Sequence, residues 1–112
     1  MSGRSDFHAI LVGDGAVPTR AALDAAWPGW DAGASLVVAA DGGATKSLAI
    51  GLAPDLMVGD ALDDMRMARA AGAHAVGIDS VLGDAAALRA AGATETATSV
   101  AAWVDRFLAA RV

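Results

Sequence analysis

The sequence predicts a single α/β domain built on a parallel β-sheet. Short apolar segments alternate with longer alanine-rich segments of helical pattern along the whole of the 112-residue chain. The apolar segments are nearly continuous, which is typical of parallel strands buried on both faces. Gly and Asp follow most of them, as expected where a parallel strand turns into the next helix. A chain of this length builds one domain around one core.

Five strands and five helices are expected, in strict alternation. The expected strands are the apolar segments at 8–12, 35–40, 55–59, 74–79 and 94–97, of which the last is the least apolar. The expected helices lie at 18–27, after Asp41-Gly42-Gly43 up to Gly51, at 61–71, at 84–92 and from Ser99 onward.

Residues that favour helix ends support these boundaries. Pro18 suits the first position of the first helix, and Pro28-Gly29 ends it. Gly72 is a C-terminal stop for the third helix. Asp84 and Ser99 are expected to cap the fourth and fifth helices. In the last helix, apolar residues recur at intervals of three and four and form one face: Val100, Trp103, Val104, Phe107 and Leu108.

The predicted architecture is a three-layer α/β/α sandwich with one five-stranded parallel sheet. We expect the flavodoxin-like, Rossmann-like strand order 2-1-3-4-5, in which the first and third strands are neighbours. Ligands of such sheets bind outside the carboxyl ends of the strands, at the point where the strand order reverses. This order therefore predicts a site between the ends of the first and third strands.

Acidic residues lie at the carboxyl ends of four of the expected strands. Asp41 and Asp60 directly follow their strands, Asp14 follows the first strand after Gly13, and Asp79 ends the fourth; Asp64 lies one turn into the helix after Asp60. Carboxylates gathered at one edge of a sheet repel each other unless a hard cation such as Mg²⁺ lies between them. We predict Asp14, Asp60 and Asp64 as ligands of a weakly bound Mg²⁺ ion.

A small phosphorylated ligand is expected beside this ion, at Asp41, Gly42 and Gly43. Glycines keep the loop tight, and backbone N–H groups at a helix start favour phosphate oxygens. The alternative is that these aspartates are only helix caps and loop residues. Lys46 is expected to be solvated rather than to bind phosphate, and no catalytic residue is predicted.

Composition excludes several classes of partner. The formal net charge is −5 and no run of Lys or Arg is present, which argues against nucleic acid and anionic membranes. No apolar segment approaches the roughly 20 residues of a membrane span. The absence of cysteine suits a reducing compartment, so we expect a cytoplasmic protein, monomeric or homodimeric.

Residues 8–60 resemble the amino-terminal part of thiamine pyrophosphokinase. The matching segments are ILVGDGAVP, VVAADGGA and GLAPDLMVGD. The resemblance implies that Asp41 and Asp60 bind magnesium and the nucleotide or thiamine. That family continues with Gly-Asp-x-Asp-Ser, whereas Leu62 and Asp63 occupy the last two positions here.

Residues 56–110 are similar to the carboxyl-terminal part of a haloacid-dehalogenase-type phosphatase. The matching segments are LMVGDALDDMRMARAAGAHAVGI and LRAAGATETATSVAAWVDRFL. This resemblance implies Asp60 and Asp64 as magnesium ligands. The family's nucleophile belongs to an Asp-x-Asp pair after the first strand, and Val12-Gly13-Asp14 supplies only the second of these residues. Without the nucleophile, no aspartyl-phosphate forms.

The two resemblances overlap at residues 54–60. We interpret the chain as an engineered or recombined chimera of two half-domains, which folds without efficient catalysis and keeps a weak Mg²⁺ or phosphate site. The alternatives are a natural small protein of either family, such as a truncated thiamine pyrophosphokinase-like protein or a minimal Mg²⁺-dependent phosphohydrolase that uses a metal-bound water. An oligomerising module is a further alternative, because a small alanine-rich domain can need a partner to bury enough apolar area.

Overall fold

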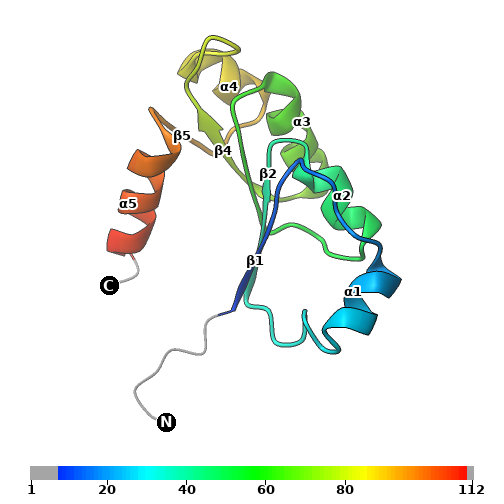
Figure 1. Cartoon of the computed structure of the whole chain (residues 1–112). Coiled ribbons are helices and arrows are strands. Elements are labelled where there is room, and N and C mark those ends of the chain that lie inside the picture. The colour runs from blue at the N-terminus through cyan, green and yellow to red at the C-terminus, as the bar shows by residue number, and fades with distance from the viewer. Residues whose placement is uncertain (1–7, 111–112) are drawn as a thin grey trace.

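A computed structural model of the chain describes residues 8–110 and contains one five-stranded parallel sheet with five helices (Figure 1). The strands are β1 (Ala9–Val12), β2 (Leu36–Ala40), β3 (Leu56–Gly59), β4 (His74–Ile78) and β5 (Glu95–Ala97). The helices are α1 (Arg20–Ala26), α2 (Gly43–Ala49), α3 (Leu62–Ala71), α4 (Ala85–Ala91) and α5 (Val100–Ala110). The predicted alternation and fold class are confirmed.

The helix boundaries follow local capping chemistry. Asp84 accepts a hydrogen bond from the backbone N–H of Ala87 at 2.8 Å, and Ser99 accepts one from Ala102 at 3.0 Å, as predicted. Gly72 ends α3 in the left-handed conformation, with a φ of 71°. Helix α1 begins later than expected, because Thr19 is its N-cap and leaves Pro18 outside the helix.

The predicted strand order 2-1-3-4-5 is wrong. The sheet has the order β1-β2-β3-β4-β5, so β1 is an edge strand and β2 separates it from β3. In the register, Val12 of β1 pairs with Ala39 of β2, and Ala40 of β2 pairs with Val58 of β3. All four residues of β3 are buried, whereas β1 buries only Val12. The fully buried β3 thus lies at the centre of the sheet and the more exposed β1 at its edge.

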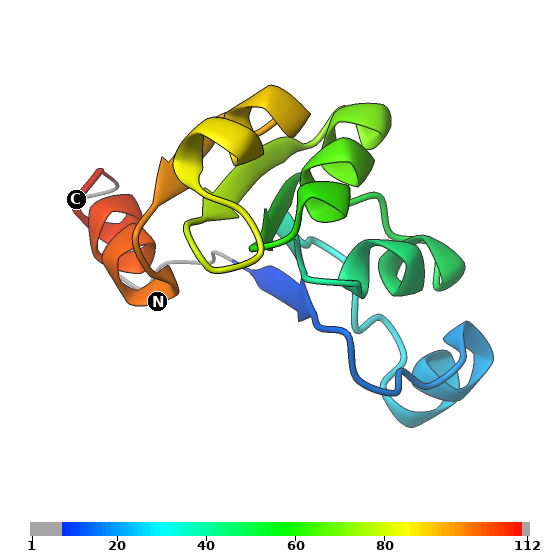
Figure 2. The same cartoon turned by 90° about the horizontal axis from the view of Figure 1, so that it is seen from above.

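This order decides where the helices lie. Right-handed crossovers that always advance in one direction across the sheet place their helices on the same face. Figures 1 and 2 show α1 to α4 together on one face and α5 on the other. Among the described residues 8–110, α5 alone forms the third layer of the sandwich. None of the described helices is long and apolar enough to cross a membrane.

The main core lies between the sheet and helices α2, α3 and α4. Its largest fully buried side chains are Met57 of β3, Met65 of α3 and Leu88 of α4. Gly77 of β4 allows this close packing, since a Cβ atom there would lie 3.0 Å from the Cβ atom of Leu88. A smaller cluster under α1 continues this layer toward the edge strand β1.

The opposite face of the sheet has a smaller core under α5. Trp103 is buried against Val58 and Val76, and its ring lies 4.9 Å from that of Phe107. Arg106 donates a hydrogen bond of 2.7 Å to Glu95 and so ties α5 to β5. Helix α5 covers only part of this face, and Leu11 on β1 therefore remains 71% exposed.

Candidate functional site

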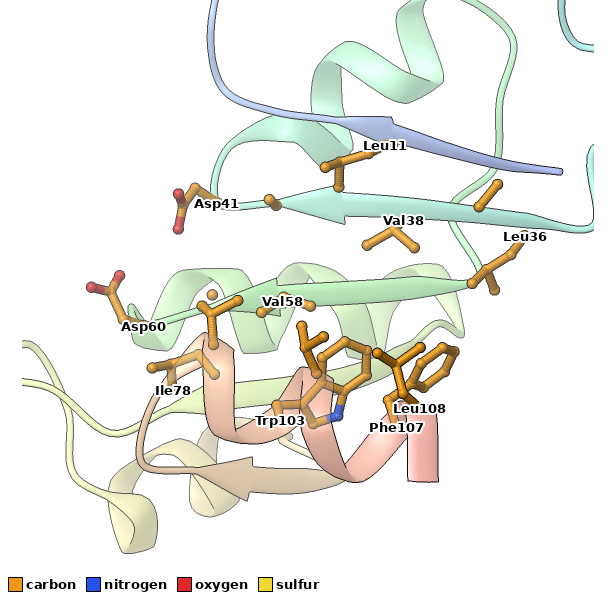
Figure 3. Close-up of a pocket in the computed structure, with 15 residues that line it drawn as sticks. Leu11, Leu36, Val38, Asp41, Val58, Asp60, Ile78, Trp103, Phe107 and Leu108 are labelled. Atoms are coloured by element: carbon orange, nitrogen blue, oxygen red, sulfur yellow. The ribbon is translucent and has the colours of Figure 1, made fainter. Parts of the chain in front are cut away.

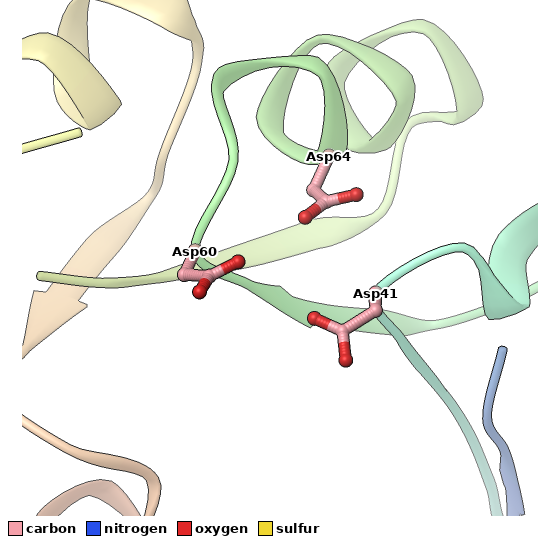
Figure 4. Close-up of side chains that lie close together, drawn as sticks. All are labelled: Asp41, Asp60 and Asp64. Carbon is pink, nitrogen blue, oxygen red and sulfur yellow. The ribbon is translucent and has the colours of Figure 1, made fainter. Parts of the chain in front are cut away.

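Three carboxylates meet at the carboxyl edge of the sheet. One oxygen from each of Asp41, Asp60 and Asp64 lies within 4.8 Å of the others (Figure 4). Asp41 is exposed, Asp60 is half-buried and Asp64 is buried, so the cluster opens to solvent on one side. This group is the candidate site.

Strand pairing brings Asp41 and Asp60 together. Each residue directly follows its strand, Asp41 after β2 and Asp60 after β3, and these strands are neighbours. The backbone N–H of Asp41 donates to the carbonyl of Val58 at 2.9 Å, which extends the ladder to the edge. The two carboxylates therefore leave the sheet side by side without any switch in strand order.

The backbone of Asp41 is in a sparsely populated conformation. Its φ is 54°, which makes it the one described residue other than glycine with a positive φ. Asp tolerates this region better than most residues, yet it still costs free energy relative to Gly. The turn directs the side chain toward Asp60 and Asp64 (Figure 4). Local strain thus accompanies the placement of a carboxylate in the cluster.

The first turn of α3 holds Asp64. Its carboxylate accepts a hydrogen bond from the backbone N–H of Ala61 at 3.2 Å, which caps the helix. It also lies against Gly59, where an added Cβ atom would be 2.3 Å from Oδ2 of Asp64. The glycine that precedes Asp60 is therefore required for the position of Asp64 as well.

The environment of Asp64 disfavours its charged form. Burial raises the pKa of Asp64 above its usual value, and the charges of Asp41, Asp60 and Asp63 add to the increase. The hydrogen bond from Ala61 acts in the opposite direction but does not cancel the effect. A cation among the carboxylates would remove this repulsion and favour the ionised form.

The oxygens lie close enough to be drawn onto one hard divalent cation. Around an octahedral Mg²⁺ ion, adjacent oxygens lie about 3.0 Å apart and opposite ones about 4.2 Å apart, because each Mg–O bond is about 2.1 Å. The three carboxylate oxygens lie within 4.8 Å of one another, so ion binding requires them to move closer together. Three protein oxygens leave positions on the solvent side for water or for oxygens of a ligand.

Asp14 lies apart from this cluster. It follows the edge strand β1, is exposed, and forms an ion pair with Lys46 of α2 at 3.5 Å. Lys46 also donates to the backbone carbonyls of Asp14, at 2.5 Å, and Gly15, at 2.6 Å. The expectation that Asp14 would lie beside Asp60 is therefore wrong, since it depended on β1 pairing with β3. We expected Lys46 to be solvated, but it instead binds the loop that follows β1.

Gly42 and Gly43 allow close packing of α2 on the end of β1. An added Cβ atom at Gly42 would lie 2.3 Å from Oδ1 of Asp14, and one at Gly43 would lie 2.0 Å from the carbonyl oxygen of Val12. These contacts explain both glycines without a ligand. Their predicted role in binding phosphate stays a prediction.

The sequence reasoning missed the apolar groove that begins at this site. Asp41 and Asp60 line one end of it, and apolar residues of the sheet and α5 line the rest. The amphipathic pattern of α5 predicts which side of the helix is buried, but not how much of the sheet the helix covers.

Comparisons of the chain with models of known protein families, with curated proteins and with solved structures found no match. The geometry of the cluster is therefore the basis for assigning a function.

Proposed function

We propose that the protein binds a phosphorylated small molecule through a Mg²⁺ ion held by Asp41, Asp60 and Asp64, without efficient catalysis. The observation that carries this proposal is the convergence of three carboxylates of graded burial at the carboxyl edge of a parallel sheet. Ligands of open α/β sheets bind at this edge. Mg²⁺ prefers carboxylate oxygens and is commonly shared between one or two carboxylates and a phosphate.

Binding is favoured over catalysis by the groups around the cluster. A haloacid-dehalogenase-type phosphatase uses the first aspartate of an Asp-x-Asp pair as its nucleophile. In this chain Val12 occupies that first position, and only the second position is an aspartate, Asp14. Asp14 itself pairs with Lys46 outside the cluster. The three cluster carboxylates can hold a cation and orient a phosphate, and they include no cationic group to stabilise a developing negative charge.

The proposed chimeric origin is compatible with this division of roles. The overlap of the two resemblances, residues 54–60, contains β3, which pairs with β2 on one side and β4 on the other. A splice on this central strand would keep both halves in one sheet. The cluster would then combine Asp41 of the first half with Asp60 and Asp64 at and after the join.

Calorimetric titration tests the proposal. Mg²⁺ is titrated into the wild type, Asp60→Asn and Asp84→Asn, and inorganic phosphate is then added. Asp84 caps α4 outside the cluster, and Asn is an equally good cap, so this variant controls for loss of one negative charge. We expect Mg²⁺ binding in the wild type and in Asp84→Asn, loss in Asp60→Asn, and phosphate binding only with Mg²⁺ present.

Hydrolysis of p-nitrophenyl phosphate separates binding from catalysis. We expect no turnover above the uncatalysed rate with Mg²⁺ present. Turnover that disappears in Asp60→Asn would replace the proposal with the metal-dependent phosphohydrolase alternative.

A further inference from the structure

An apolar groove extends from the carboxylate cluster between the sheet and α5 (Figure 3). Its volume is about 580 Å³, which lies within the range of small-molecule sites. One wall is the face of β1, β2 and β3 that carries Leu11, Val38 and Val58. The other is the face of α5 that carries Trp103 and Leu108. We call this space the α5 groove.

The described chain leaves the α5 groove open. Parallel sheets are normally covered on both faces, yet Leu11 on the sheet side is 71% exposed and Leu108 on the helix side is 55% exposed. Ligand-binding grooves are concave and lined mainly by apolar side chains, and contiguous exposed apolar patches mark interaction sites.

The charges of the groove indicate its occupant. Asp41 and Asp60 close one end, and the other described residues that line it are all apolar. No Lys or Arg is among them, so the groove itself offers no cation to pair with the carboxylates of a second copy packed groove to groove. A ligand with one polar head and a long apolar body matches both parts of the groove.

The groove also has the length for such a body. Strand β2 runs along it from Leu36 to Ala40, and Asp41 follows at the polar end. Five residue steps of a parallel strand span roughly 16 Å. This distance accommodates an extended alkyl chain or a short isoprenoid chain.

We propose that the α5 groove binds the apolar body of an alkyl or isoprenyl phosphate, with its phosphate on the cation at Asp41 and Asp60. This ligand class rests on the function proposed above, since the cation converts an acidic end into one that attracts a phosphate. Burial of each methylene in the groove adds to affinity, so affinity should rise with chain length.

The test measures binding of ethyl phosphate and n-decyl phosphate, with and without Mg²⁺, below the micelle concentration of the decyl compound. The ¹H–¹⁵N NMR signal of the Trp103 indole reports on the groove, and those of Trp27 and Trp30, which do not line it, serve as references. With Mg²⁺, we expect n-decyl phosphate to bind at least about tenfold more tightly than ethyl phosphate and to shift the Trp103 signal.

Two leucines on helices provide matched variants. Leu108 lines the groove and is 55% exposed, whereas Leu48 on α2 does not line it and is 56% exposed. We expect Leu108→Asn to weaken n-decyl phosphate roughly tenfold and Leu48→Asn to have no effect. Leu11→Asn, on the sheet side, should weaken the decyl compound as Leu108→Asn does.

The possible failures are distinguishable. If Mg²⁺ alone does not bind, the function proposed above fails. If Mg²⁺ binds but chain length has no effect, only the groove assignment is overturned. Equal binding of decanol or tighter binding of decylamine would overturn the phosphate head group. A dimer in light scattering whose Trp103 signal ignores n-decyl phosphate would assign the groove to a second copy and overturn the proposal.

Discussion

The carboxylate of Asp64 occupies the space that a side chain at Gly59 would need. A Cβ atom added at Gly59 would lie 2.3 Å from Oδ2 of Asp64 and 2.7 Å from its Cβ atom. The last residue of β3 and the first turn of α3 therefore fit together only with glycine at position 59. This contact links the end of the central strand to the deepest carboxylate of the cluster.

Gly59→Ala should displace Asp64 and abolish Mg²⁺ binding, although no carboxylate is removed. The added methyl group forces Asp64 or the backbone to move, and the overlap should lower the free energy of unfolding by about 1–3 kcal/mol. Urea unfolding and Mg²⁺ calorimetry measure the two effects. Gly13→Ala is the matched control, because a Cβ atom there meets nothing within 4 Å. Unchanged Mg²⁺ affinity in Gly59→Ala would contradict the assigned role of Asp64.

Asp64→Asn should stabilise the metal-free protein at neutral pH. Since folding raises the pKa of Asp64, the folded state binds more protons than the unfolded state between the two pKa values. The contribution of Asp64 to the free energy of unfolding is fully present below the pKa that it has in the unfolded state, about 3.9. This contribution is lost as the pH rises through the higher pKa of the folded state. The uncharged Asn keeps an acceptor for the N–H of Ala61.

Thermal melts of the metal-free protein, from pH 7 downward, test whether Asp64→Asn is stabilising. The melting temperature of Asp64→Asn should exceed that of the wild type at pH 7, and the difference should shrink as the pH falls. Added Mg²⁺ should raise the melting temperature of the wild type and not that of the variant. A variant less stable than the wild type at pH 7 without metal would show that the Asp64 charge is favourable.

Two substitutions of Asp41 should have the same effect on metal binding but different effects on stability. Asp41→Gly removes the carboxylate but accepts the positive φ, whereas Asp41→Ala removes the carboxylate and keeps the strain. Both variants should lose Mg²⁺, and the glycine variant should be more stable than the alanine variant by about 1 kcal/mol. Equal stability in urea unfolding would mean that the turn relaxes when the side chain is lost.

Glu95→Gln should reduce the loss of stability in acid. Burial opposes ionisation of Glu95, but hydrogen bonds from His74, at 2.5 Å, and from Arg106 hold its pKa below the usual value. Its contribution is present above the unfolded pKa and is lost as the pH falls through the folded pKa. Between pH 6 and pH 3, the melting temperature of Glu95→Gln should therefore fall less than that of the wild type.

Much of the fold could be predicted from the sequence because its signals are local. Asp84, Ser99 and Gly72 act within one turn of their own helices, and each has its predicted role. Strand order is different, because an apolar segment such as HAILV pairs equally well with either neighbour. The order depends on long-range packing, and here the four buried residues of β3 take the centre of the sheet.

The candidate site was predicted in part for the same reason. Asp60 and Asp64 lie on one strand–helix unit, so their proximity does not depend on strand order. The third member depends on which strand neighbours β3, and it is Asp41 of β2 rather than Asp14 of β1. The α5 groove could not be predicted, because the amphipathic pattern of a helix does not show how much of a sheet it covers.

The most direct test of the central claim is a Mg²⁺ titration followed by amide NMR, with Asp60→Asn beside the wild type. We expect amide chemical-shift changes confined to the ends of β2 and β3 and the first turn of α3, near residues 41–43 and 59–64. They should be absent from Asp60→Asn and should not extend to Asp14. A well-dispersed spectrum that does not respond to millimolar Mg²⁺ would overturn the proposed metal site and show that the three aspartates are loop and capping residues.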